Sequence, residues 1–162
     1  MAEAAARLWV GPSAPFVPPP NPDGTRDLNP EDPGSLHYTH IIQGNLGQTR
    51  VSNWRDLLDF AVRTASQKSV PFSSIQQIAA ARDQDPSERS FHQVEGTKEG
   101  TKIWVRAMDA NQCWQRSFRL AQQTGVEIYV LIEWEDTEGA ANPGQKARLQ
   151  WSPPASANVG PQ

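Results

Sequence analysis

Cysteine and long apolar runs are nearly absent from this chain. Cys113 is the single cysteine among 162 residues, so no disulfide can form within the chain and a disulfide-stabilised secreted scaffold is excluded. No stretch approaches the roughly 20 apolar residues that cross a bilayer. Residues 1–20 lack the basic start and apolar run of a signal peptide. We therefore expect a cytoplasmic protein with no membrane partner.

Runs of lysine or arginine are missing as well. Fifteen basic and eighteen acidic side chains leave a net charge of −3, and the excess acid falls within residues 1–36. Proteins that wrap nucleic acid concentrate positive charge to meet the phosphates, and this chain does not. Glycine-rich nucleotide-binding motifs are also lacking, because the turn Gly44–Gly47 is not followed by the lysine of a phosphate loop. We expect no bound cofactor.

Proline is abundant, and most of it lies at the ends. Of fourteen prolines, eight lie in residues 12–33 and four in residues 143–161, and such composition favours extended, poorly ordered chain. We expect a disordered tail over residues 1–35, a single α+β domain over residues 36–152 and a second tail over residues 153–162. The Pro-x-x-Pro spacings of the first tail fit docking in an aromatic groove, and they fit a plain linker equally well.

Two segments of the middle show helical periodicity before residue 80. After Ser52, a favourable N-cap, apolar residues recur at spacings of three and four until Pro71 stops the pattern. The stripe consists of Trp54, Leu57, Leu58, Ala61, Val62 and Ala65. Ser73 or Ser74 is expected to cap a shorter helix that carries Ile75, Ile78 and Ala79.

A further helix is predicted between Asp109 and Gly125. Asp109 and Gln112 have the spacing of a capping box, and Gly125 suits a helix C-terminus. The residues expected on its buried stripe are Cys113, Trp114, Phe118 and Ala121.

Alternating apolar residues predict the strands. Residues 37–42 are expected to form a strand before the turn Gly44–Gly47, and residues 91–94 and 102–108 a hairpin around a polar turn. Val126–Glu135 alternates over its whole length, and Lys146–Trp151 is expected to add an edge strand. The element order matches the ferredoxin-like (split βαβ) plan, an antiparallel sheet with two main helices on one face and a short inserted helix.

The residues that could carry catalysis or bind a metal do not have the spacing that such sites require. Acidic residues and a lysine near the hairpin are the nearest approach to a metal-dependent, nuclease-like hydrolase, but we expect them to be solvated loop residues: Asp83, Asp85, Glu95 and Lys98. His37, His40, His92 and Cys113 lack the spacing of a zinc site, so no metal is expected. Cys113 lies on an apolar stripe, where burial disfavours the thiolate of a nucleophile.

Tryptophan is the most unusual component, with six in the chain. If helices cover the face that carries Ile103 and Ile128, the reverse face presents four residues suited to binding: Trp104, Arg106, Tyr129 and Arg148. We expect a non-enzymatic protein-interaction module that uses this aromatic face or an edge strand to bind a protein partner or a second copy of itself. Cover of the face by the tails is the plain alternative. A single-stranded nucleic-acid-binding domain that stacks bases and adds Lys102 is the other, although neighbouring glutamates disfavour phosphates.

Overall fold

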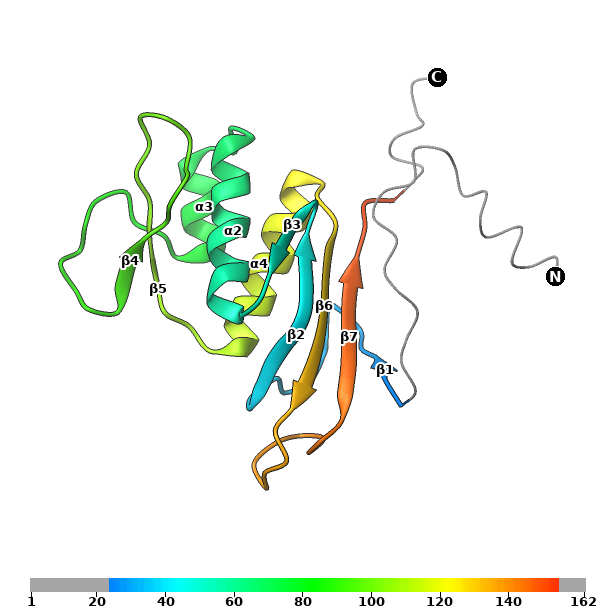
Figure 1. Ribbon diagram of the computed structural model, residues 1–162. Helices are drawn as coiled ribbons and strands as arrows, with labels where there is room; N and C mark the ends of the chain where they lie inside the picture. The colour runs from blue at the N-terminus through cyan, green and yellow to red at the C-terminus, as the bar shows by residue number, and fades with distance from the viewer. Residues whose placement is uncertain (1–23, 155–162) are drawn as a thin grey trace, which may run out of the picture.

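Five strands form one mixed sheet. The computed structural model describes residues 24–154, and the strand order across this sheet is β1-β7-β6-β2-β3 (Figure 1). Its members are β1 (Arg26–Asp27), β2 (Thr39–Leu46), β3 (Thr49–Val51), β6 (Ile128–Trp134) and β7 (Lys146–Trp151). β1 runs parallel to β7, and the other neighbouring pairs are antiparallel.

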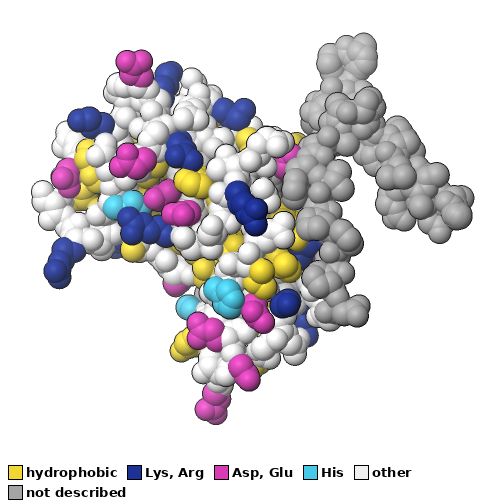
Figure 2. Space-filling model, viewed as in Figure 1, with side chains coloured by type: hydrophobic (Ala, Val, Ile, Leu, Met, Phe, Trp, Pro, Cys, Tyr) yellow, Lys and Arg dark blue, Asp and Glu magenta, His cyan; other side chains and the backbone are white. Residues whose placement is uncertain are grey.

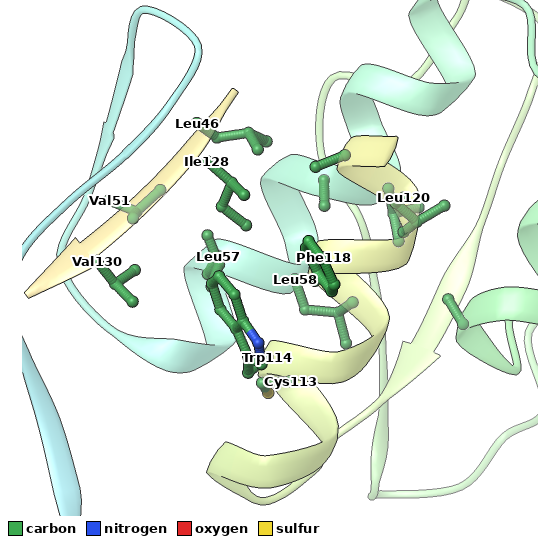
Figure 3. Packing of buried hydrophobic residues seen from close by; sticks show 14 of the residues in the cluster. Leu46, Val51, Leu57, Leu58, Cys113, Trp114, Phe118, Leu120, Ile128 and Val130 are labelled. Carbon is green, nitrogen blue, oxygen red and sulfur yellow. The ribbon is translucent and has the colours of Figure 1, made fainter. Parts of the chain in front are cut away.

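Helices cover one face of this sheet. They are α2 (Trp54–Gln67), α3 (Phe72–Ala79) and α4 (Ala110–Thr124). α2 and α4 lie next to the sheet and α3 lies farther out (Figure 1). Figure 3 shows Leu57 of α2 and Trp114 of α4 between the two helices and β6, where Ile128 and Val130 face them. All four side chains are at most 1% exposed, so this helix–sheet interface is the centre of the hydrophobic core.

The first predicted helix is confirmed, although its cap differs. Leu57, Leu58 and Val62 of the predicted stripe are buried. The N-cap is Asn53 and not Ser52, because the Asn53 Oδ1 accepts a hydrogen bond of 2.8 Å from the backbone N–H of Asp56. The helix ends at Gln67, before Pro71.

The second long helix, α4, forms as predicted. The Asp109 Oδ1 accepts a hydrogen bond of 2.8 Å from the Gln112 N–H, and Gly125 ends the helix with a φ of 71°. The short helix α3 is also present, but the predicted serine caps are wrong. Pro71 occupies the cap position and Ser73 and Ser74 lie inside the helix, because proline presets a φ that a helix start accepts.

The predicted hairpin forms, but it does not join the large sheet. β4 (Phe91–Gln93) pairs with β5 (Trp104–Arg106) in a sheet of their own, which lies beyond α2 and α3 on the side away from the five strands (Figure 1). Arg82 exchanges two backbone hydrogen bonds of 2.9 Å with Trp104. The outer side of β5 therefore pairs with a loop residue, where a strand of the large sheet was expected. The α+β class is confirmed; the ferredoxin-like strand arrangement is not.

A short strand missed by the sequence analysis takes the hairpin's expected place in the sheet. β2 continues through Gly44 to Leu46, and the turn falls at Gly47, whose φ is 59°. Gly44 is not a turn residue: a Cβ there would lie 2.7 Å from Cγ2 of Val51. The glycine allows β2 and β3 to pack closely. Because glycine is also common in turns, the predicted strand ends too early.

The start of the domain also lies earlier than predicted. β1 pairs with β7 through Arg26 and Asp27, and the indole N–H of Trp114 donates a hydrogen bond of 2.8 Å to the Pro30 carbonyl. These contacts move the N-terminal boundary of the domain from the predicted position near Leu36 to a position before Arg26. The remainder of the two predicted tails, residues 1–23 and 155–162, lies outside the described residues.

Candidate functional site

The four residues predicted to share a face lie in two different sheets. Trp104 and Arg106 belong to β5 in the small sheet, whereas Tyr129 lies in β6 and Arg148 in β7. α2 and α4 separate the two pairs (Figure 1). The expected single aromatic platform is therefore not formed. The binding role of each pair stays a prediction.

Tyr129 and Arg148 take part in the packing of the large sheet. Tyr129 is 1% exposed, and burial raises the pKa of its hydroxyl. The nearby Asp27 carboxylate raises this pKa further, whereas the Arg148 guanidinium lowers it. The Nε of Arg148 donates a hydrogen bond of 2.8 Å to the Asp27 carboxylate on the neighbouring strand. A ring buried to this degree offers no face on which a base or a partner stacks. The reverse face of the sheet is thus not open at β6 as the sequence pattern predicted.

Trp104 and Arg106 share the outward face of β5. Val105 between them is fully buried, while Trp104 is half-buried and Arg106 exposed, so the alternation read from the sequence holds along this strand. Arg106 borders a shallow hollow of about 180 Å³ that also contains Arg82 and Phe91. The Arg82 guanidinium lies 5.0 Å from the centre of the Phe91 ring. This surface is small, and one of its two guanidinium groups, that of Arg82, already has an aromatic partner.

Cys113, His92 and Asp59 lie around a second, smaller hollow, but they do not form a nucleophilic site. The Nε2 of His92 lies 2.7 and 2.9 Å from the two oxygens of Asp59, which ties β4 to α2. Burial raises the pKa of the Cys113 thiol to about 12, with Asp109 and Asp59 adding to the shift and Arg116 opposing it. A thiol with that pKa is almost entirely protonated at neutral pH and is a poor nucleophile.

Two of the four residues considered for a hydrolase, Asp85 and Lys98, hold loops together. The Nζ of Lys98 donates to the Ser69 hydroxyl at 3.1 Å, and Asp85 accepts a hydrogen bond of 2.8 Å from the Ser87 N–H. Among residues 24–154 there is no group of three or more His, Cys, Asp or Glu side chains placed to hold a metal ion. In the same range, no helix is both long and apolar enough to cross a membrane.

An open strand edge is the feature that the sequence analysis did not locate. β3 pairs only with Gly44–Leu46 of β2. The segment of β2 from Thr39 to Gln43 therefore has β6 on one side and, within the part of the chain that the structure describes, no strand on the other. Unpaired backbone groups along such an edge are a template for a further strand. We call Thr39–Gln43 the open edge.

Two exposed hydrophobic side chains mark this edge. Among the described residues, the large hydrophobic side chains that are exposed are Tyr38, at 53%, and Ile42, at 41%. Ile42 is the extra residue where the β2–β6 register shifts between Ile41 and Gln43. Bulges re-aim side chains at strand edges. Here the bulge turns an isoleucine toward solvent.

Tyr38 is held at the end of the open edge by the loop after β6. Its φ of 65° lies in the left-handed region, which costs a non-glycine residue about 1 kcal/mol. The Tyr38 carbonyl accepts a hydrogen bond of 2.8 Å from the Glu135 N–H. The ring rests against Gly139, where a Cβ would lie 2.7 Å from Cε2. The loop therefore fixes an exposed aromatic ring in a strained conformation, an arrangement that is common at binding sites.

Acidic side chains surround this end of the edge. His40 lies 3.4 Å from the Glu133 carboxylate, and the loop that holds Tyr38 carries Glu135, Asp136 and Glu138. Figure 2 shows acidic and histidine side chains gathered at the lower end of the molecule, where the β6–β7 loop lies in Figure 1. Neither residues 28–49 nor residues 120–145 contain a lysine or arginine. The surroundings of the open edge are thus negatively charged.

No family model matches the chain, and neither a curated protein nor a solved structure is detectably similar to it.

Proposed function

We propose that this domain is a non-enzymatic protein-interaction module that binds an extended segment of another protein along the open edge. The observation that carries the proposal is the coincidence of an unpaired strand edge with both exposed large hydrophobic side chains of the described chain, Tyr38 and Ile42. In strand addition, main-chain hydrogen bonds supply affinity and alternate side chains supply specificity. Ile42 and Tyr38 are placed to supply the specificity.

Two of the usual protections against such pairing, lysine and proline, are missing from the edge. Natural edge strands are protected by lysine, proline, a bulge or a covering segment. Residues 37–46 contain no lysine, arginine or proline. A bulge is present, but it carries an exposed isoleucine instead of a charge. An edge that exposes apolar side chains without a charged residue is more consistent with recognition than with avoidance of partners.

The proposal is tested by selecting short random peptides from a displayed library on the full chain. The selected peptides are synthesised, and their affinities are measured for the wild type and for Ile42→Lys, with Gln77→Lys as the matched control on the exposed surface of α3. We expect wild type and Gln77→Lys to bind equally and Ile42→Lys to bind at least about tenfold more weakly. Circular dichroism confirms that each variant is folded.

A second arm tests the main-chain contacts. Methylating alternate backbone nitrogens of a selected peptide removes the donors on one edge while every side chain is kept. We expect one of the two alternating methylation patterns to abolish binding and the other to preserve it. Equal affinity for wild type and Ile42→Lys, or indifference to both methylation patterns, would refute strand addition at this edge.

The alternatives from the sequence have less support. A single-stranded nucleic-acid-binding domain loses its platform, because Tyr129 is buried and Trp104 lies in the other sheet. The hydrolase residues Asp85 and Lys98 are engaged in loop contacts. Self-association and a cytoplasmic location stay predictions.

A further inference from the structure

We infer that the segment bound by the open edge is a basic extended peptide, whose lysine or arginine side chains meet the acidic loop after β6. This inference rests on the proposed function and adds the chemical class of the partner. It depends on where the charges lie relative to the edge.

The acidic loop is joined to the open edge through main-chain contacts. Thr39 pairs with Trp134 in the β2–β6 register, and the next residue, Glu135, donates its N–H to the Tyr38 carbonyl at 2.8 Å. Glu135, Asp136 and Glu138 are exposed. The loop is therefore fixed beside the first residues of β2 on the side of β6, so β2 separates it from any strand added at the open edge.

The opposing cations are few. Lys146 of β7 pairs in register with Glu133 of β6, and Arg50 lies on β3 at the other end of β2, opposite Asn45. The exposed Arg55 follows Trp54, whose indole N–H donates a hydrogen bond of 3.2 Å to the Thr39 hydroxyl. His40 is next to Glu133. Within the described residues the open edge therefore has three carboxylates at one end, Glu135, Asp136 and Glu138, and no lysine or arginine of its own. Such a charge distribution selects partners of opposite sign and speeds their association.

The charges do not decide against a second copy of this chain, which is therefore one of the outcomes of the test below. In an antiparallel pairing of two identical edges, each acidic loop lies at the opposite end of the pair from the other and toward the end that carries Arg50. A basic segment is attracted by the acidic loop directly. The apolar contact with Ile42 requires in addition that the segment carry at least one β-branched or aromatic side chain.

Two synthetic peptides with one β-prone core of valine, isoleucine and threonine test the inference. One has lysines on both sides of the core and the other has glutamates. Their affinities are measured by fluorescence anisotropy against the wild type and against the double variant Glu135→Lys/Asp136→Lys. The matched control, Asp83→Lys/Glu88→Lys, makes the same change of net charge in the exposed loop before β4.

We expect the wild type and the matched control to bind the lysine peptide at least tenfold more tightly than the glutamate peptide. In Glu135→Lys/Asp136→Lys the preference should reverse. Raising the salt concentration from about 0.05 to about 0.5 M should weaken the lysine peptide's binding, because exposed charges are screened over a few ångströms at high salt.

The outcomes separate this inference from the proposed function. If both peptides bind the wild type equally and Ile42→Lys abolishes both, the edge binds extended segments and the charge preference is wrong. A preference for the glutamate peptide also overturns the inference. If neither peptide binds while sedimentation shows a dimer that Ile42→Lys dissociates, a second copy is the occupant. If neither peptide binds and no dimer forms, the inference and the proposed function both fail.

Discussion

Gly44→Ala tests the contact that determines where the open edge ends. The substitution places a Cβ 2.7 Å from Cγ2 of Val51 and 3.2 Å from Cγ1 of Val130. Ordinary contacts of a Cβ begin at 3.4 Å, so Val51 must retreat by roughly 0.7 Å inside a packed interface. Overpacking of this kind costs about 1–3 kcal/mol, whereas replacing a strand glycine by alanine regains about 0.5–1 kcal/mol of chain entropy. We expect a net loss of about 1–2 kcal/mol in the free energy of unfolding.

A double-mutant cycle isolates this contact. Val51→Ala removes Cγ2 and should cost about 2–3 kcal/mol by itself, because Val51 is 2% exposed and two methyl groups leave the core. In the Val51→Ala background, Gly44→Ala should cost less than about 1 kcal/mol, so the two substitutions should be coupled by more than about 0.5 kcal/mol. Urea unfolding of the full chain, followed by tryptophan fluorescence, measures all four free energies. Additivity within about 0.3 kcal/mol would show that β3 does not pack on Gly44, and the extent of the open edge would then be wrong.

Three further results are expected. Alkylation of Cys113 at pH 8 should be at least about 1,000-fold slower in the folded chain than in urea, because a pKa of about 12 instead of 9.0 lowers the thiolate fraction by that factor; similar rates in both states would contradict the burial. Burial raises the pKa of Asp59 above 3.8, while its hydrogen bond and charge contact with His92 act against the shift. The protonated carboxyl is therefore favoured in the folded state, so the stability it contributes is present below pH 3.8 and is lost as the pH rises through the raised pKa. The free energy of unfolding of wild type minus that of Asp59→Asn should decrease from pH 4 upward in urea titrations, and an increase would contradict the direction of the shift. Asp109→Ala should cost about 1 kcal/mol through loss of the cap on α4, and an unchanged urea midpoint would show that the cap is not used in solution.

The helices were predictable because their information is local. The spacing of Leu57, Leu58 and Val62 defines one face of α2 whatever packs against it. Asp109 and Gly125 bound α4 through contacts within one turn of the chain. The α2 cap was assigned one residue too early, since Ser52 and Asn53 are both favourable N-caps and only the backbone geometry distinguishes them.

The candidate site was not predictable to the same degree. Residues 37–42 were recognised as strand-forming, but their exposure depends on β3 being too short to cover them. The one available signal was the absence of lysine and proline from residues 37–46, which becomes informative only once the segment is known to lie at an edge.

By itself, the sequence determined the helices, the extended segments that became β6 and β7 and the existence of the hairpin, since these depend on side-chain period and on caps a few residues apart. Tertiary structure alone decided which strands are neighbours. A period of two assigns residues to faces but does not name the partner that receives the backbone hydrogen bonds. That choice moved Trp104 into a separate sheet, buried Tyr129 and left one side of Thr39–Gln43 without a neighbouring strand within the described residues. The two-residue strand β1 depends on the same long-range pairing, because nothing in Arg26 and Asp27 predicts a strand without β7 beside them.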